Sequence, residues 1–110
     1  MKVSIIIPVY NEKKTIISLL QKVLSIKDIS KQIIIIDDGS NDGSTDLIKK
    51  YSYNKNIKLI FHKRNKGKGA AIKSAVKYIS GKIVIIQDAD LEYSPNDYYK
   101  LLKPFSQENT

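Results

Sequence analysis

Asp88 and Asp90 are placed in the sequence so that they could hold a metal ion. Ala89 separates them, and both follow the apolar run Ile83–Ile86, so they lie on an extended segment that leaves a predicted strand. Carboxylates at this spacing can each present one oxygen to a hard divalent cation, and Mg²⁺ or Mn²⁺ would keep positions open for phosphate oxygens. Alone, the D-x-D pattern is weak, because an aspartate at a strand end can simply cap a turn.

A second acidic stretch follows the apolar run Ile33–Ile36. Within ten residues it contains four aspartates, which are Asp37, Asp38, Asp42 and Asp46. The later two are typical of a turn and of a helix start. From Asp38 onward the spacing resembles an EF-hand calcium loop, but the twelfth position is Lys49, where that loop requires a bidentate glutamate. A calcium loop is therefore not expected.

The glycine-rich stretch "NKGKGAA" is suited to lie near a phosphate. It is not a Walker loop, because Ile72 stands where a glycine must precede the Lys-Ser pair. It also lacks the dinucleotide-binding fingerprint, since no strand runs directly into Gly67. A phosphorylation domain of the receiver type is not expected either, because it requires a lone aspartate where the third strand ends, and "FHKRN" stands there.

The elements that must position these groups alternate along the chain. Four β-branched apolar runs are typical of strands that are buried on both faces of a parallel sheet. They are Val3–Ile7, Ile33–Ile36, Ile57–Phe61 and Ile83–Ile86. Three of the four runs lead directly into chemistry-bearing segments.

Helices are predicted between the strands, because apolar residues recur there at helical spacing. The first spans residues 12–26, the second begins at Ser44 or Thr45, and the third spans residues 69–80 and is ended by Gly81. A fourth is predicted after Ser94, which serves as its cap. The expected inward-facing residues are Ile16, Leu19, Leu20, Val23 and Leu24 in the first helix, Leu47, Ile48 and Tyr51 in the second, and Ile72, Ala75, Val76 and Ile79 in the third.

The order β-α-β-α-β-α-β-α predicts an α/β fold: one open, mostly parallel sheet with helices on both faces. Ligands bind such sheets in the crevice beyond the carboxyl ends of the strands, where the strand order reverses. The segment "PVYNE" and both aspartate pairs follow strand ends, so we expect them to converge on one crevice. Because like charges repel there, a cation is the natural way to hold them.

The composition of the chain limits which kinds of site, location and partner are expected. The 110 residues include 19 Lys and Arg against 11 Asp and Glu, which gives a formal net charge of +8, and no cysteine. Disulfides, thiolate zinc sites and a cysteine nucleophile are thereby excluded. No run approaches the ~20 apolar residues of a membrane span or forms a signal peptide, so a cytoplasmic location is expected. The charge favours anionic partners, but the lysines are scattered and the crevice is acidic, so a nucleic-acid partner is not expected.

Four motifs in order carry a resemblance: "IIIPVYNE", "IIIIDDGSNDGSTD", "NKGKGAA" and "QDADLEYSP". Together they resemble the nucleotide-binding half of a family 2 glycosyltransferase with the GT-A fold, nearest to the dolichyl- or polyprenyl-phosphate mannosyl- and glucosyltransferases. The resemblance implies that residues 1–110 are the Rossmann-like, N-terminal nucleotide-sugar-binding part of a longer, here truncated, GT-A domain. The implied reaction is inverting transfer of a sugar from a GDP- or UDP-linked donor, with polyprenyl phosphate at a membrane surface as the acceptor.

The resemblance also implies a nucleotide-sugar site. Its expected residues are Pro8, Tyr10, Glu12, Ile36, Asp38, Lys68, Asp88, Ala89 and Asp90. Tyr10 would offer a flat face, Asp38 would accept hydrogen bonds from base or ribose, and Lys68 would face a phosphate. Packing alone explains Pro8 as a strand end and Tyr10 as a contact under the following helix, but it does not explain Glu12. Helix–sheet packing explains the small residues 69–71 equally well.

By the same resemblance, Asp88 and Asp90 are the catalytic carboxylates and, with Glu92, the ligands of Mg²⁺ or Mn²⁺. The ion would offset charge on the leaving diphosphate. A lipid-phosphate acceptor is already ionised at neutral pH, so a strong general base is unnecessary. Asp37 is expected to brace its loop, and His62, the only histidine, is assigned no chemistry.

Two alternatives stay open. A non-catalytic nucleotide-binding module or an inactive fragment would keep the first two motifs but has little use for the D-A-D sequence. We expect residues 1–110 alone to bind nucleotide weakly and to turn over slowly or not at all. The predicted strand Ile83–Ile86 lacks a neighbour on its open side, so a homo-oligomer through this exposed sheet edge is a further expectation.

Overall fold

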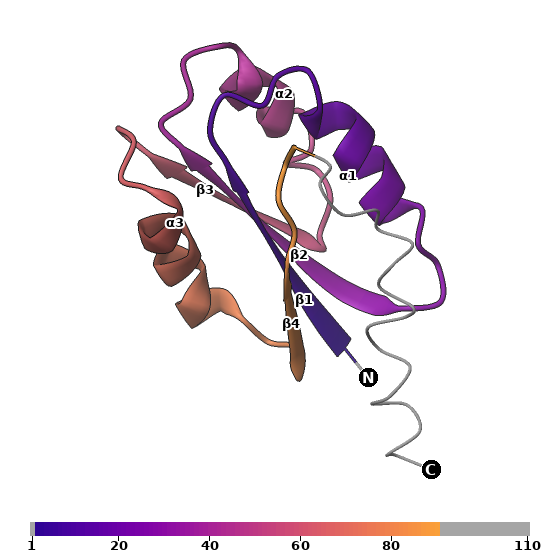
Figure 1. Cartoon of the computed structure of the whole chain (residues 1–110). Helices are drawn as coiled ribbons and strands as arrows, with labels where there is room; N and C mark the ends of the chain where they lie inside the picture. Colours follow the sequence, from indigo (N-terminus) through magenta and orange to yellow (C-terminus); the bar gives the residue numbers. More distant parts are fainter. Residues whose placement is uncertain (1, 91–110) are drawn as a thin grey trace.

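The four β-branched runs form one parallel sheet in the computed structural model, which describes residues 2–90 (Figure 1). The strands are β1 (Lys2–Val9), β2 (Ser30–Asp38), β3 (Ile57–His62) and β4 (Ile83–Ile86). Their order across the sheet is β3-β2-β1-β4, and every neighbouring pair is parallel. The predicted open parallel α/β sheet is therefore confirmed.

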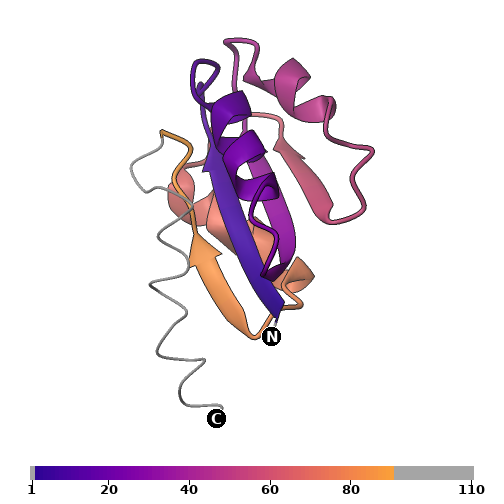
Figure 2. The same ribbon diagram turned by 90° about the vertical axis from the view of Figure 1, so that its right-hand side faces the viewer.

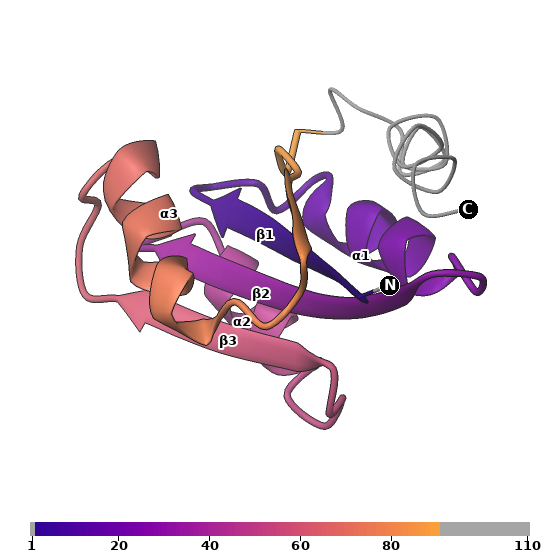
Figure 3. The ribbon, with the colours of Figure 1, turned by 90° about the horizontal axis from the view of Figure 1, so that it is seen from below.

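The helices occupy the predicted intervals but are shorter than expected. They are α1 (Ile16–Leu24), α2 (Ser44–Lys49) and α3 (Lys68–Ala75), and a short 3₁₀ helix, η1 (Val76–Tyr78), continues α3. Helix α1 and helix α3 lie on opposite sides of the sheet, as Figures 2 and 3 show. The predicted fourth helix, after Ser94, lies outside the described residues.

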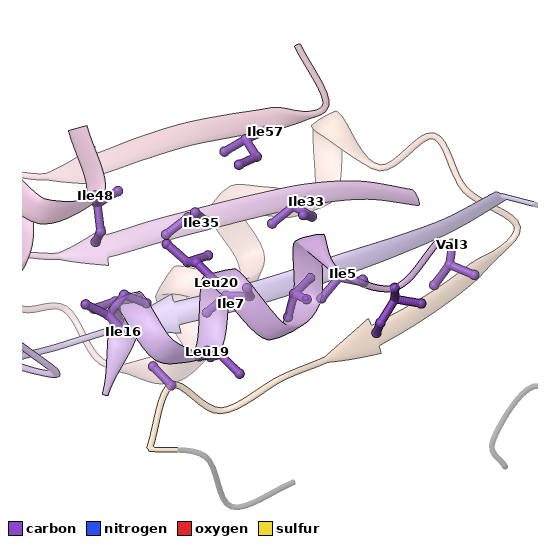
Figure 4. Close-up of a cluster of buried hydrophobic side chains, with 14 residues drawn as sticks. Val3, Ile5, Ile7, Ile16, Leu19, Leu20, Ile33, Ile35, Ile48 and Ile57 are labelled. Carbon is purple, nitrogen blue, oxygen red and sulfur yellow. The ribbon is translucent and has the colours of Figure 1, made fainter. Parts of the chain in front are cut away.

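The strand register divides the core into two layers. Ile5 pairs with Ile33 and Ile7 pairs with Ile35, and these side chains pack with α1 and α2 (Figure 4). The alternate residues of the same strands pack on the other face, against two alanines of α3. Because both faces of β1 and β2 are covered, these strands are continuous apolar runs rather than alternating ones. The second layer consists of Ile6, Ile34, Ile36, Ala71 and Ala75.

The start of α2 differs from the prediction in its cap. Gly43, with φ 101°, precedes the first helical residue, and neither Ser44 nor Thr45 acts as the cap. Instead, the Asp42 carboxylate accepts a hydrogen bond from the Ser44 backbone N–H at 2.9 Å. The carboxylate therefore satisfies one of the donors that a helix start leaves unpaired.

The third predicted helix was wrong in its end and in one residue of its inner face, Val76. The other three inward-facing residues are confirmed, since Ala75 is buried and Ile72 and Ile79 pack against the second layer. Val76 is 56% exposed rather than inward-facing, because α3 stops at Ala75 and the chain tightens into η1. The buried line of α3 consists of Ala71 and Ala75, four residues apart, and these small side chains let the helix lie close to the sheet. Gly81 does not end the helix. A Cβ at Gly81 would lie 2.7 Å from the Ser4 nitrogen, so glycine is needed where the chain enters β4 beside β1.

The strand order reverses between β1 and β4. Strands β2 and β3 extend the sheet on one side of β1, and β4 adds to its other side. Ligands bind parallel sheets beyond the carboxyl ends of the strands at such a reversal. The loops after β1 and β4 therefore flank the expected crevice.

Candidate functional site

A pocket of about 270 Å³ lies at this reversal point. The segments after β1, β2, β3 and β4 and the helix α3 all contribute to its wall. Eight of the nine predicted nucleotide-sugar residues line it, and Ile36 is the exception. The lining residues are Pro8, Val9, Tyr10, Glu12, Asp38, Asn65, Lys68, Ala71, Asp88, Ala89 and Asp90.

Ile36 is fully buried under α3, so the structure does not bring its side chain to the pocket. Three lining residues were not among the predicted ones: Val9, Asn65 and Ala71. Asn65 opens the "NKGKGAA" motif, so its position was visible in the sequence although no role was given to it. Two reasons were weighed for the small residues, helix–sheet packing and close approach to a ligand. Ala71 fits both, because its side chain packs between α3 and the sheet and it also lines the pocket.

The loop after β1 is held by the loop after β2. Three consecutive backbone N–H groups, those of residues 11–13, donate to side chains of the second loop. Their acceptors are Ser40 Oγ at 2.9 Å, Ser44 Oγ at 3.0 Å and Asp42 Oδ2 at 3.1 Å. Each of these bonds joins segments that are about thirty residues apart in the chain. They fix the loop after β1, which forms one wall of the pocket, before any ligand binds.

Tyr10 stands at the tip of this wall with 45% of its surface exposed. It is therefore not packed under α1, and the packing explanation does not account for it. Its ring lines the pocket, which leaves a flat apolar face available to a ligand.

The two aspartates that end β2 have different surroundings. Asp37 is buried and braces its own loop: Oδ1 accepts from the Ser40 backbone N–H at 3.1 Å, and Oδ2 accepts from the Thr45 hydroxyl. This is the bracing role expected from the sequence. Only Asp38 of the pair lines the pocket.

Asp38 is buried but carries three hydrogen bonds. Oδ1 lies 2.8 Å from His62 Nδ1 and accepts from the Lys66 backbone N–H at 2.9 Å, while Oδ2 accepts from the Gly67 backbone N–H at 2.8 Å. Burial raises the pKa of this carboxyl, but the hydrogen bonds from His62, Lys66 and Gly67 outweigh burial and hold the pKa below its ordinary value. Asp38 is therefore ionised at neutral pH.

Gly39 explains how the segment after β3 comes so close to Asp38. Its φ is +77°, and a Cβ there would lie 2.5 Å from the carbonyl carbon of Arg64. Both observations require glycine. The close approach brings the backbone of residues 64–67 against the end of β2, where Asp38 receives its two backbone donors.

The middle residue of the D-A-D segment packs in the core. Ala89 is 4% exposed and belongs to the core cluster, and it lines the pocket together with the aspartates on either side. The Thr15 hydroxyl donates to the Ala89 carbonyl at 2.6 Å, which ties the segment to the start of α1. A small apolar residue between two carboxylates therefore anchors the pair while both remain at the pocket.

A cation already lies beside one of these carboxylates. The Lys68 ammonium is 2.5 Å from Asp88 Oδ1. Within residues 2–90 no three His, Cys, Asp or Glu side chains come together as a metal site, and the third predicted ligand, Glu92, lies outside the described residues. The donor set nevertheless fits Mg²⁺ or Mn²⁺, because it consists of carboxylate oxygens that face a pocket and accept a cationic partner there.

Comparison with known proteins points to one family. The sequence model of the family described as Glycosyl transferase family 2 matches residues 4–110. The chain is also 40% identical over 106 residues to an undecaprenyl-phosphate 4-deoxy-4-formamido-L-arabinose transferase of Aeromonas hydrophila. That match covers 92% of this chain and 32% of the relative, so the chain spans about a third of its curated relative's length.

Solved structures contain the same fold. TarS 1-349 of S. aureus, in complex with UDP-GlcNAc, matches with a TM-score of 0.79 and 30% identity over 98% of this chain and 32% of that one. The mannosyltransferase PcManGT from Pyrobaculum calidifontis, in complex with GDP-Man and Mn²⁺, matches with a TM-score of 0.72 and 26% identity over 80% of this chain and 27% of that one. The sheet described above thus corresponds to the N-terminal part of GT-A structures.

Proposed function

Because this chain belongs to glycosyl transferase family 2, we propose that its pocket binds a nucleoside-diphosphate sugar and that the chain is the donor-binding part of an inverting sugar transferase. One observation carries the proposal. At the reversal between β1 and β4, a single pocket gathers an exposed aromatic ring, a buried ionised carboxylate, a lysine and the paired aspartates. These are the groups that a base, a ribose and a metal-bound diphosphate need.

Each part of the donor has a matching side chain. Tyr10 offers a face on which a base can stack. Asp38 accepts hydrogen bonds from a ribose hydroxyl or a base N–H, and its ionised state strengthens them. Lys68 lies close enough to the aspartates to reach a phosphate at the same place. The relatives support either nucleotide, since TarS binds UDP-GlcNAc and PcManGT binds GDP-Man.

The metal belongs to the proposal as well. Asp88 and Asp90 would hold Mg²⁺ or Mn²⁺, with Glu92 as a further ligand, and the Mn²⁺ bound to PcManGT supports this assignment. When bound, the ion supplies Lewis-acid stabilisation of the leaving diphosphate. The chain's own contribution is position, because the Thr15 bond to the Ala89 carbonyl and the burial of Ala89 hold the backbone between the two aspartates.

A polyprenyl phosphate is the proposed acceptor. This proposal is supported by the relative from Aeromonas hydrophila, whose name gives undecaprenyl phosphate. A phosphate oxygen is ionised at neutral pH and needs no strong base, which agrees with a pocket whose acidic groups are already engaged. No helix in residues 2–90 has the length and apolar character to cross a membrane. We propose that the whole protein meets this acceptor at the cytoplasmic membrane face, because the relative's acceptor is a lipid carrier.

Calorimetric titration tests the donor site. Wild-type chain, Asp90→Ala and the control Asp28→Ala are titrated with UDP and with GDP, each with and without Mn²⁺. Asp28 is exposed and does not line the pocket, so its removal matches the change in charge alone. We expect metal-dependent binding of one nucleotide that Asp90→Ala abolishes and Asp28→Ala retains. Metal-dependent binding that survives in Asp90→Ala would contradict the assignment.

A further inference from the structure

We infer that His62 is a positioning residue for nucleotide binding, acting through Asp38 and the backbone of residues 66–67. The inference rests on the proposed function of the pocket and adds a group to which no role has been assigned. His62 does not line that pocket, and its side chain is 8% exposed. Any effect on a ligand therefore passes through the groups that it holds.

One hydrogen-bond partner fixes the role of one imidazole nitrogen. The Asp38 carboxylate is ionised and can only accept, so His62 Nδ1 must carry the proton that it donates over 2.8 Å. On the other side of the ring, Nε2 lies 2.8 Å from the Ser74 hydroxyl of α3. In the neutral ring this nitrogen accepts the hydroxyl proton. His62 thus joins the ends of β2 and β3 to α3.

Counting acceptor positions shows what His62 does to Asp38. A carboxylate oxygen accepts about two hydrogen bonds. Among the partners that residues 2–90 supply, His62 and the Lys66 backbone N–H fill Oδ1, whereas Oδ2 accepts from the Gly67 backbone N–H alone. Within this part of the chain, one acceptor position therefore remains, and it belongs to Oδ2. His62 therefore turns a group with two equivalent oxygens into one that offers a single, oriented acceptor to a base N–H or ribose hydroxyl.

The same bond also places the segment that follows β3. Lys66 and Gly67 donate to the carboxylate that His62 orients, and this segment carries Asn65 and Lys68 into the pocket. If Asp38 rotates, both backbone donors lose their acceptor together. The imidazole thus positions both Asp38 and the segment of residues 65–68 at the pocket without contacting the ligand itself.

Two amide substitutions separate the two sides of the ring. In His62→Asn, the side-chain amide nitrogen is attached to Cγ as Nδ1 is, so it can still donate to Asp38 but cannot reach Ser74. In His62→Gln, the amide nitrogen stands where Nε2 does, so it can reach Ser74 but not Asp38. Both variants lose the ring and its packing, which makes them matched controls for each other, and Ser74→Ala removes the α3 contact alone.

Nucleotide affinity is the first readout. We expect His62→Asn and Ser74→Ala to bind UDP or GDP within about threefold of wild type, and His62→Gln to bind about tenfold more weakly, the scale of a lost charge-assisted hydrogen bond. Equal affinities for the Asn and Gln variants would overturn the inference. If wild type binds no nucleotide, the proposed function fails, and the second readout still decides the role of His62.

The second readout needs no ligand. NMR titration of the Asp38 carboxyl and amide exchange of Lys66 and Gly67 are measured in the same variants. We expect the pKa of Asp38 to rise in His62→Gln and to stay low in His62→Asn, with loss of protection at both amides only in the Gln variant. An unchanged pKa and unchanged exchange in His62→Gln would show that His62 is only a packing residue.

Discussion

Lys68 Nζ and Asp88 Oδ1 lie 2.5 Å apart inside the pocket. Lys68 is 57% exposed in its side chain and Asp88 is 23% exposed, so water and salt screen the pair. Exposed ion pairs of this kind contribute at most about 1 kcal/mol. If a divalent ion binds Asp88 as proposed, we expect it to compete with Lys68 for this carboxylate, so that the ammonium can turn toward a phosphate.

Replacing this lysine should affect metal and nucleotide in opposite directions. In Lys68→Met, we expect the affinity for Mn²⁺ alone to rise by up to about fivefold. The ion then no longer competes with an ammonium group whose ion pair with Asp88 contributes about 1 kcal/mol. Nucleoside diphosphate affinity should fall, because a phosphate loses its partner. Paramagnetic resonance of free Mn²⁺ measures the first effect and calorimetry the second. Lys73→Met, an exposed α3 substitution that does not line the pocket, should change neither.

Asp38 should make the stability of the fold depend on acid. Its folded pKa lies below its unfolded value of about 3.9, so its stabilisation is present above that unfolded value and is lost as pH falls through the folded one. At pH 7, Asp38→Asn should be less stable by about 1–3 kcal/mol, because three hydrogen-bond donors lose an ionised acceptor.

The difference in stability between wild type and Asp38→Asn should shrink as pH falls below about 4, where the unfolded chain begins to protonate Asp38, and should be lost as pH passes through the lower folded pKa. Urea unfolding at pH 7 and pH 3 measures both gaps. Asp28→Asn, at an exposed position, serves as the control. A gap that is equally large at pH 3 would mean that packing rather than ionisation is responsible.

Two glycine-to-alanine substitutions should change the stability of the fold in opposite directions. Gly39→Ala forces a side chain into a positive φ and to 2.5 Å from the Arg64 backbone, so a loss of at least about 1–3 kcal/mol is expected. Gly69 is the second residue of α3, and in the described part of the chain an added Cβ there would have no heavy atom within 4 Å outside its own helix and chain neighbours, so Gly69→Ala should stabilise the fold by about 0.5–1 kcal/mol. Thermal unfolding of both variants gives the signs directly. A neutral Gly39→Ala would show that the segment after β3 can move away.

Thr15 should matter for the D-A-D segment although it does not line the pocket. Thr15→Val keeps the shape of the side chain but leaves the buried Ala89 carbonyl without its 2.6 Å donor. We expect Mn²⁺-dependent nucleotide binding to weaken about threefold to tenfold, and Thr15→Ser, which keeps the hydroxyl, to restore it. If the Val and Ser variants bind equally, the hydroxyl does not position the aspartates.

The sequence predicted those features that depend on residues close together along the chain. The strand Ile83–Ile86 was predicted with its observed bounds, because its apolar run stops abruptly before Gln87. The convergence of the motifs after β1, β2 and β4 followed from parallel strands, whose carboxyl ends meet at one edge. The pocket lining confirms that convergence for Asp38, for the D-A-D aspartates and for the segment after β1, but not for Asp37, which is buried and bonded to its own loop. The binding roles of the individual residues stay predictions.

The features that were missed depend on contacts between distant segments. Asp38 and His62 are 24 residues apart and meet only because the register pairs them on β2 and β3. No periodicity marks such a pair. Val76 was misplaced for a related reason, since the change from α3 to η1 is decided by the tertiary fit of the chain and not by its apolar spacing. The expected sheet-edge oligomer stays a prediction, although Val84 and Ile86 of β4 are 44% and 43% exposed.

The pairing of β1 with both β2 and β4 has a consequence in time. Lys2 of β1 meets Ser30, 28 residues later, whereas Val3 meets Ile83, 80 residues later. Closing the longer loop costs more chain entropy, and contacts between distant segments form more slowly. During refolding, amides of β1 and β2 should thus be protected before those of β4 in pulse-labelled hydrogen exchange. On a ribosome, the wall that carries Tyr10 would be assembled while the aspartates that face it are still being synthesised.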